Sequence, residues 1–179
     1  DPAQSSAALA EVSTLLNQRQ AEWHAWVPSD LTRINAALAA GGSAVAPASV
    51  VELIARSRPL ARASEGLFDP AVGGLVAAWG FHTSTFPVLT APPGEAWLQR
   101  WREARPRLDQ LRVDGNVVSG SNPAVQLDFG AIAEGLASET ILEVLARHGV
   151  RHALVSLGGD IVALGDGNGR PWRVGLQDP

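Results

Sequence analysis

A single carboxylate stands where an apolar segment runs into a long predicted helix. Asp128 follows residues 125–127, and the helix begins after a small-residue turn at Gly130. Such a joint points backbone N–H groups and the positive end of the helix dipole at one place, which suits an anion, most commonly phosphate. An acid beside a phosphate needs a divalent cation between the two. The pattern indicates a site for a metal-bound phosphate or pyrophosphate compound, although a plain helix N-cap at Asp128 explains the same residues.

The composition narrows the class of protein. A chain of 179 residues, 46% of them apolar, can form one compact domain with a proper core. It has no apolar run near the roughly 20 residues that span a bilayer. The net charge of −4 and the scattered arginines argue against a nucleic-acid surface. Without Cys there are no disulfides or thiolate metal sites, and without Tyr a ring ligand could stack only on Trp or Phe.

The first half of the chain predicts helices. Apolar spacing predicts a long first helix through Trp23, and a second over residues 31–38, capped by Ser29 or Asp30. Ser49 with Glu52 forms a capping-box pattern for a third helix, which Pro59 should bend or end. A short helix over residues 72–79 and one carrying Trp97 and Trp101 follow, separated by an irregular loop over residues 82–93.

The second half predicts mostly strands. Residues 111–118 form a hairpin with a glycine turn, and 124–127 form a strand that leads into a helix over 132–147. Gly149 ends that helix, with His148 in its last turn. Three further strands are predicted at 153–156, 161–164 and 172–176. Helices first and a mostly antiparallel sheet later define an α+β class, organised as a single domain over residues 1–179.

Four motifs in a fixed order resemble the ApbE family of flavin transferases, the FAD:protein FMN transferases. They are the joint at 125–135, the segment 64–76 followed by Trp79-Gly80-Phe81, the strand and turn at 154–160, and Pro171-Trp172-Arg173-Val174-Gly175. Residues 31–35 echo the family's early Leu-x-Arg-x-Asn. The resemblance spans nearly the whole chain and implies an ApbE-like, T-fold-related domain.

The resemblance also implies particular roles for residues. Leu67, Phe68 and Asp69 match a segment that contacts FAD, as does Asp128, while the backbone carbonyl of Ala131 matches a Mg²⁺ ligand. The turn at Gly158 and Gly159 lies near the flavin in the family, and Trp26 stands one residue from a tyrosine that it would replace as a stacking face. The full set of expected FAD-binding residues is Trp26, Leu67, Phe68, Asp69, Asp128, Glu134, Gly158 and Gly159, with Ala131 as the metal ligand and no catalytic residue assigned.

Each of these residues also has a simpler structural explanation. Asp69-Pro70 is a common helix start, and two adjacent glycines most often form a hairpin turn. Trp79 and Phe81 could line a ring pocket, but such aromatics are more often core residues. His148 suits the end of a helix better than a metal site shared with His152.

Two departures from the family bear on activity. Glu134 stands where the family has a Lys that approaches the FAD phosphates, so a local charge of +1 becomes −1. At about 4 Å and an effective dielectric near 20, each such unit interaction is on the order of 4 kcal/mol. The family's opening strand and a later segment with most metal-binding side chains are expected to be absent, leaving residues 1–179 incomplete at both ends.

The leading hypothesis is Mg²⁺-dependent transfer of FMN from FAD to a Thr or Ser hydroxyl of an acceptor protein, with release of AMP. The alternative is an FAD-binding protein or FAD pyrophosphatase without transfer, favoured by Glu134; a purely structural lobe is the third. The resemblance implies acceptor flavoproteins, such as subunits of membrane redox complexes, as partners. It also implies a bacterial periplasmic location, with a membrane contact only through a lost N-terminal lipid anchor.

Overall fold

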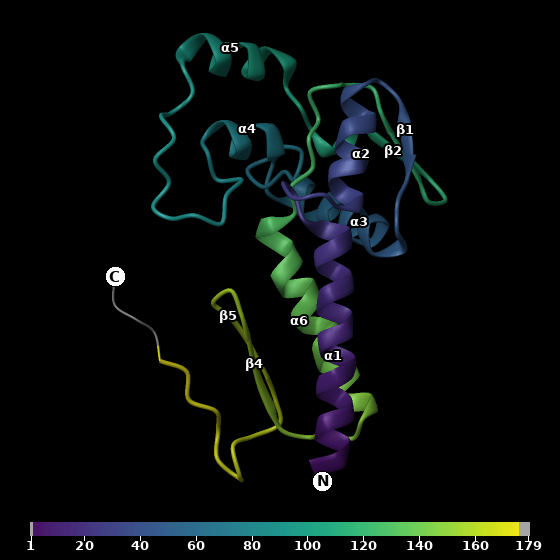
Figure 1. The fold of residues 1–179 in the computed structure, drawn as a ribbon, viewed down its shortest axis with the longest axis vertical. Coiled ribbons are helices and arrows are strands. Elements are labelled where there is room, and N and C mark those ends of the chain that lie inside the picture. The colour runs from purple at the N-terminus through teal and green to yellow at the C-terminus, as the bar shows by residue number, and fades with distance from the viewer. Residues whose placement is uncertain (1, 176–179) are drawn as a thin grey trace. The chain divides into compact units, whose positions relative to one another are not determined.

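The computed structural model describes residues 2–175, with side chains from residue 5 onward. The chain divides into two compact units. The central unit comprises Gln18–Ala133, and the terminal unit comprises Asp1–Asn17 with Glu134–Pro179. Helices α1 (Pro2–Trp23) and α6 (Gly130–Arg147), labelled in Figure 1, each cross a boundary between the units in the sequence. Helices with two antiparallel sheets confirm the predicted α+β class.

The central unit holds four complete helices, α2 (Asp30–Ala39), α3 (Ala48–Ala63), α4 (Gly73–Ala78) and α5 (Glu95–Ala104), and the 3₁₀ helix η1 (Leu108–Gln110). Ser29 caps α2 as predicted: its Oγ accepts a hydrogen bond from the N–H of Thr32, whose own hydroxyl accepts one from the N–H of Ser29. The apolar face of α2 is fully buried through Leu31, Ile34 and Leu38. Burial of this face fixes the position of α2, the helix that carries Asn35.

Helix α3 corrects the predicted capping box and excludes one of the two effects predicted for Pro59. The capping box at Ser49 and Glu52 is wrong, because the helix already begins at Ala48, after Pro47, and Ser49 is buried inside it. The hydroxyl of Ser49 instead donates to Glu22 and accepts from the Trp23 indole N–H. Pro59 does not end the helix, which continues to Ala63. Pro59 is exposed, so water can serve the carbonyl that loses its helical partner.

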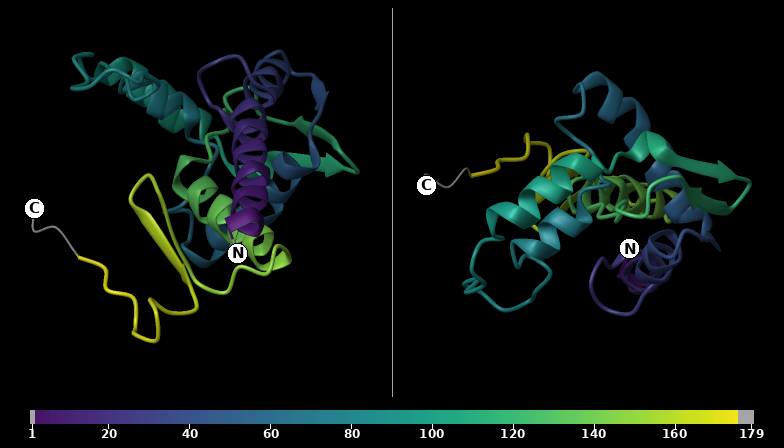
Figure 2. Two further views of the ribbon diagram at one scale, coloured as in Figure 1. Left: turned by 60° about the horizontal axis from the view of Figure 1, so that its bottom comes forward. Right: turned by 90° about the horizontal axis from the view of Figure 1, so that it is seen from above.

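A three-stranded antiparallel sheet lies in the central unit, in the order β1-β3-β2. The predicted hairpin is confirmed as β2 (Leu111–Asp114) and β3 (Val117–Gly120), and its ribbon is seen from two sides in Figure 2. Gly115 takes a φ of 58° in the two-residue turn. Strand β1 (Ser43–Val45) pairs with β3 and was not predicted, because three residues after Gly41-Gly42 give too short an alternation to detect.

The predicted strand at 124–127 is wrong. This segment forms only an isolated parallel bridge, between Gln126 and Val72. The N–H of Gly73 donates to the Gln126 carbonyl at 2.8 Å, and the N–H of Asp128 donates to the Pro70 carbonyl at 2.8 Å. The segment is therefore extended and held from both sides, with the side chain of Asn35 bonded to the backbone of Leu127 where a second strand would pair.

The terminal unit packs the start of α1 against α6 and a two-stranded hairpin, β4 (Ala153–Leu157) with β5 (Asp160–Leu164). Its buried core consists of Ala8, Ile141 and Leu145. The last predicted strand is wrong where it can be followed, because residues 172–175 form no regular element, and residue 176 lies outside the described residues. Among the residues that the structure describes, no helix is long and apolar enough to cross a bilayer.

Candidate functional site

The carboxylate of Asp128 is held from two sides in the central unit. One oxygen, Oδ1, accepts a hydrogen bond from the N–H of Gly130 at 2.9 Å. The other, Oδ2, lies 2.9 Å from Nε2 of His82. The side chain of Asp128 is only 12% exposed. The interpretation of Asp128 as the helix N-cap is wrong, because α6 begins at Gly130 and Phe129, whose carbonyl accepts the first intrahelical hydrogen bonds, is the N-cap residue. Asp128 instead closes a turn onto Gly130 and contacts His82.

An aromatic cluster adjoins this carboxylate. The Trp26 ring stacks on His82, with centroids 5.3 Å apart and planes at 20°. The His24 ring meets Trp26 edge-on at 4.3 Å, and Nδ1 of His24 accepts from the N–H groups of Trp26 and Val27. Burial, and then the charge of His82, lower the pKa of His24 below its ordinary value. Trp26 remains 41% exposed, so part of its ring is open to a ligand.

The first turn of α6 is open. Gly130 and Ala131, where the sequence predicts a phosphate, are both exposed. The helix has 18 residues, long enough for its dipole to favour an anion at this end. The N–H of Gly130 is already taken by Asp128, so an anion here would use the following N–H groups.

The residues described here do not complete a magnesium site. Both oxygens of Asp128 have hydrogen-bond partners, and the helical carbonyl of Ala131 is directed toward the N–H of Gly135. Residues 2–175 contain no group of three or more His, Cys, Asp or Glu side chains that could hold a metal ion. Ala131 as a Mg²⁺ ligand stays a prediction.

In the segment 67–69, Asp69 has a structural role and Leu67 is exposed. The Asp69 carboxylate accepts from the N–H of Ala71 at 2.9 Å and from the N–H of Leu108 at 3.0 Å, so its oxygens stabilise the turn and the start of η1. Leu67 is 95% exposed, and Phe68 is half-buried. The predicted helix start at Asp69-Pro70 is wrong, because α4 begins at Gly73 with Val72 as its N-cap, and the structural role of Asp69 is to fix the turn and η1. The side chain of Leu67 is left exposed. Contact of these residues with FAD remains a prediction.

Glu134 meets the glycine turn of the terminal unit. Gly158 and Gly159 join β4 to β5 with φ values of 56° and 111°, which confirms the hairpin turn. A Cβ placed on Gly158 would lie 2.1 Å from Oε1 of Glu134. The positive φ of Gly158 favours glycine at this position, while the Glu134 carboxylate is the end of a flexible side chain that can move aside. The structure thus brings together two pairs of predicted site residues. Glu134 and Gly158 are neighbours in the terminal unit, and in the central unit Trp26 and Asp128 are linked through His82.

His82 was not among the residues predicted from the sequence. It lies 46 positions from Asp128, at the start of the irregular loop, and no periodicity or motif marks it. Its neighbours Trp79 and Phe81 are 40% and 53% exposed, so they are not the core residues that their type suggested. His148 and His152 also lie beside carboxylates: His148 is 2.7 Å from Glu11, and His152 is 3.1 Å from Asp166. Hydrogen bonds from His148, and then Arg147, lower the pKa of Glu11.

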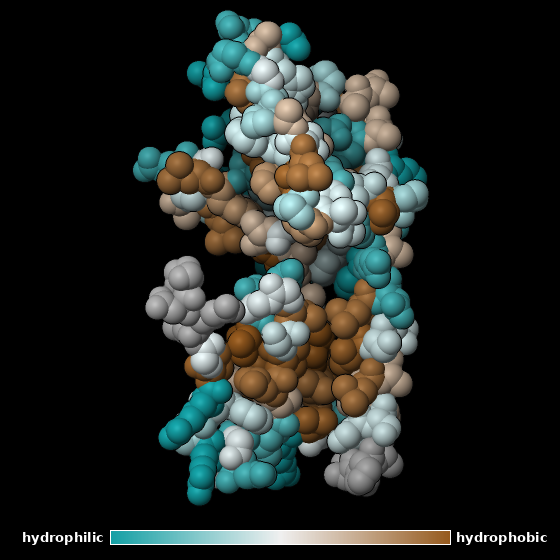
Figure 3. Space-filling model, turned by 60° about the vertical axis from the view of Figure 1, so that its left-hand side comes forward, coloured by the Kyte–Doolittle hydropathy of each residue, from teal (hydrophilic) through white to brown (hydrophobic). Residues whose placement is uncertain are grey.

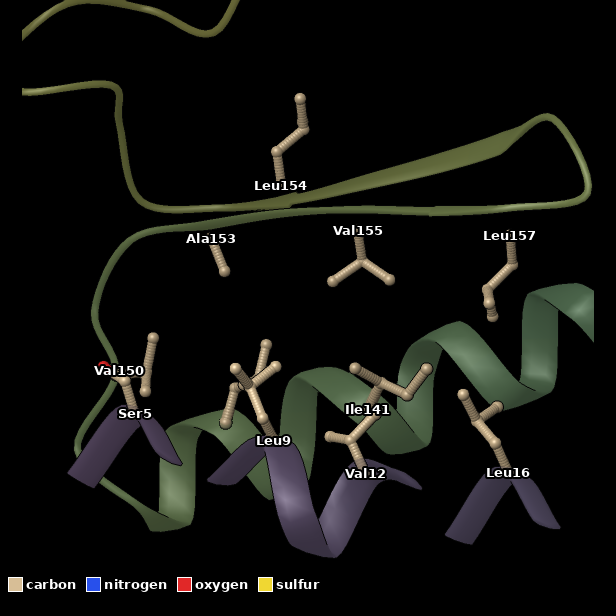
Figure 4. A pocket seen from close by; sticks show the side chains of 11 residues that line it. Ser5, Leu9, Val12, Leu16, Ile141, Val150, Ala153, Leu154, Val155 and Leu157 are labelled. Carbon is tan, nitrogen blue, oxygen red and sulfur yellow. The ribbon is translucent and has the colours of Figure 1, made fainter. Parts of the chain in front are cut away.

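The terminal unit also contains an apolar groove of about 350 Å³, visible as a brown hollow in Figure 3. In Figure 4, Ala153, Val155 and Leu157 point from β4 toward α1 and α6, while Leu154 points away. The lining residues are Ser5, Leu9, Val12, Leu16, Ile141, Leu145, Val150, Ala153, Leu154, Val155 and Leu157. None of the predicted FAD-binding residues lines this groove.

Solved structures of flavin transferases share this fold. A mutant of the Vibrio cholerae flavin transferase ApbE matches 98% of the chain with a TM-score of 0.85 and 25% identity, over 59% of its own length. The apo form of the Pseudomonas stutzeri flavinyl transferase ApbE matches 96% with a TM-score of 0.83 and 29% identity, over 54% of its length. The fold is thus that of the flavin-transferase class.

Sequence comparison gives the family. The ApbE family profile matches residues 3–179. The FAD:protein FMN transferase of Rhodobacter capsulatus is 43% identical over 99% of the chain, and that of Treponema pallidum is 34% identical over 97%. This chain belongs to the ApbE family. It spans 34% of the length of the first relative and 51% of the second.

Proposed function

We propose that this chain binds FAD and carries part of the site of an FAD:protein FMN transferase. The observation that carries the proposal is the junction in the central unit, where the open first turn of α6, the Asp128 carboxylate and the partly exposed ring of Trp26 meet. A helix N-terminus suits a pyrophosphate, and an indole face suits a planar heterocycle. FAD contains both groups. Membership of the ApbE family supports the choice of this dinucleotide.

The proposed reaction is a phosphoryl-group transfer. The oxygen of an acceptor Thr or Ser hydroxyl forms a bond to the phosphorus of the FMN half, and the bond from that phosphorus to the AMP oxygen breaks. AMP leaves with the electron pair, and the hydroxyl proton passes to a base that the described residues do not identify. The contribution of this chain is to position the pyrophosphate and the ring.

Dependence on Mg²⁺ is part of the proposal for an electrostatic reason. The pyrophosphate would lie near the carboxylate of Asp128, at a site without lysine. A divalent cation bound to the phosphates, with water completing its shell, would offset this repulsion. We expect FAD to bind more tightly with MgCl₂ than with EDTA in isothermal titration calorimetry; equal affinities would contradict the magnesium part alone.

The transfer itself is tested by incubating the protein with FAD, MgCl₂ and an acceptor flavoprotein subunit that has a target threonine. The expected result is an increase in acceptor mass equal to one FMN residue, with AMP released in equal amount. Asp128→Asn should lower the rate, and Asp109→Asn, in an exposed position, should not. An acceptor of unchanged mass would contradict transfer.

A second function is favoured by Glu134, whose carboxylate lies against the Gly158 turn where a lysine would meet phosphate. In this alternative the protein binds FAD, or hydrolyses it to FMN and AMP, without transfer. Free FMN and AMP with an unmodified acceptor would support it. Glu134→Lys should tighten FAD binding if residue 134 faces the phosphates, whereas Glu139→Lys, on the same helix, is the control. Equal FAD affinities in the wild type and Glu134→Lys would place residue 134 away from phosphate.

The proposal extends to partners and location. Acceptor flavoproteins, such as subunits of membrane redox complexes, are the proposed protein partners, and the bacterial periplasm is the proposed compartment, with a lipid anchor as the proposed link to the inner membrane. Cell fractionation of the source bacterium tests this location. Recovery of the protein in the cytoplasmic fraction would contradict it.

A further inference from the structure

His82 is the side chain that touches two of the predicted FAD-binding residues at once. Its Nε2 lies 2.9 Å from Oδ2 of Asp128, and its ring is stacked on Trp26 at a centroid distance of 5.3 Å. The His82 side chain is 18% exposed. Because a carboxylate only accepts hydrogen bonds, Nε2 must carry the proton in this contact. One face of the His82 ring thus packs on Trp26, while its Nε2–H donates to the Asp128 carboxylate.

The chain before His82 holds it in place. The end of α4 is closed by hydrogen bonds from the N–H of Gly80 to the Ala77 carbonyl and from the N–H of Phe81 to the Val76 carbonyl. The loop then folds back, since a Cβ on Gly80 would lie 2.5 Å from the Thr90 side chain. The backbone before His82 is therefore fixed, and this holds the His82 side chain beside Asp128.

The two contacts fix different parts of the site. With Oδ1 held by Gly130 and Oδ2 held by His82, the Asp128 carboxylate cannot rotate freely at the first turn of α6. Stacking on His82 covers one face of Trp26, and His24 contacts its edge, so the exposed 41% of Trp26 presents a defined surface. Displacing His82 would release both the acid and the ring.

We propose that His82 is a positioning residue of this site, which sets the orientation of Trp26 for a planar heteroaromatic ring and that of Asp128 for the adjoining phosphates. This inference rests on the proposed function. The ring could be the isoalloxazine or the adenine of FAD, since both stack on an indole face. His82 acts through Trp26 and Asp128 and takes no part in bond making.

Two substitutions separate the two contacts. His82→Phe keeps an aromatic plate under Trp26 and removes the donor to Asp128, while His82→Gln keeps an N–H donor and removes the plate. His82→Ala removes both, and His152→Gln is the matched control, because His152 also lies beside an aspartate but in the terminal unit. Circular dichroism confirms that each variant is folded.

The first measurement needs no ligand. Acrylamide quenching of Trp26 emission is obtained by subtracting the Trp26→Phe variant of each protein. We expect greater quenching in His82→Gln and His82→Ala, and wild-type quenching in His82→Phe and His152→Gln. If His82 only stabilised the fold, its substitutions would not produce this difference in quenching between His82→Gln and His82→Phe.

The second measurement is the affinity for FAD, FMN and AMP by calorimetry. We expect His82→Phe to weaken FAD binding about tenfold through Asp128, and His82→Gln to weaken it by a similar factor through Trp26. His82→Gln should affect FMN selectively if the isoalloxazine rests on Trp26, and AMP selectively if the adenine does. Wild-type protein that binds none of the three overturns the proposed function and this inference with it. FAD binding by wild type, with all three His82 variants within twofold of it and unchanged Trp26 quenching, overturns the role of His82 alone.

Discussion

The side-chain amide of Asn35 pairs with the backbone of Leu127 as a neighbouring strand would. Its Nδ2 donates to the Leu127 carbonyl at 2.9 Å, and its Oδ1 accepts from the Leu127 N–H at 2.7 Å. Both residues are buried, and Gln126 reaches back to the Asn35 carbonyl. The Asn35 side-chain amide on α2 thus fixes the backbone of Leu127, and this in turn fixes the position of the next residue, Asp128.

The first prediction concerns this pair. Asn35→Ala leaves the buried N–H and carbonyl of Leu127 without partners, and each such group costs about 1–3 kcal/mol. We expect the free energy of unfolding to fall by about 3 kcal/mol in urea denaturation, with weaker FAD binding in the fraction that folds. Asn116→Ala, in the exposed β2–β3 turn, should change stability little. A loss below about 0.5 kcal/mol in Asn35→Ala would contradict the pairing.

Sequence reasoning located the main helices and the hairpins because their signals are local. Ser29 capped α2, the glycine turn joined β2 to β3, and Gly158-Gly159 joined β4 to β5, as predicted. It failed where a distant partner replaced a local one. Ser49 bonds to Glu22 instead of capping its helix, and residues 124–127 meet the Asn35 side chain instead of a strand.

The candidate site divides in the same way. The joint at Asp128 and the open turn at Gly130 follow from a short stretch of sequence. The role of Asp69 in fixing Leu108 depends on residues 39 positions apart, and the pairing of His82 with Asp128 depends on residues 46 apart. A single sequence contains no sign of such contacts, whereas a resemblance to a family can transfer only the positions that match its motifs.

A second prediction concerns Gly73, where α4 passes close to the segment before Asp128. A Cβ at this position would lie 2.8 Å from the carbonyl oxygen of Gln126, a backbone atom that cannot move aside cheaply. Gly73→Ala should cost about 1–3 kcal/mol in urea denaturation, the usual range for overpacking. Gly94→Ala, with no atom within 4 Å of the added Cβ, is the control and should be nearly neutral. Equal stability of the two variants would contradict the close approach.

A third prediction concerns Gly135, which lies exposed inside α6 with open space around it. Because glycine is a poor helix former, Gly135→Ala should raise the free energy of unfolding by up to about 1 kcal/mol. Ala146→Gly, exposed in the same helix, should lower it by a similar amount. FAD titration then tests whether a ligand approaches the backbone at Gly135. Weaker FAD binding by the more stable Gly135→Ala would mean that it does, and unchanged binding would exclude this close approach.

The last prediction follows from the lowered pKa of His24, whose ordinary value is 6.5. Its Nδ1 accepts from the N–H groups of Trp26 and Val27, and a proton on this nitrogen would end both contacts. Below 6.5 the unfolded chain takes up a proton that the folded chain refuses, so the stability from His24 is complete above 6.5 and is lost as the pH falls through the lower, folded pKa.

His24→Asn keeps an acceptor near the position of Nδ1 and cannot titrate in this range. Urea denaturation at pH values on both sides of 6.5 should therefore show a larger loss of stability toward acid for the wild type than for His24→Asn. Parallel curves for the wild type and His24→Asn would mean that His24 is as easily protonated in the folded chain as in the unfolded one, and Trp26 would then not depend on a neutral His24 for its backbone contact.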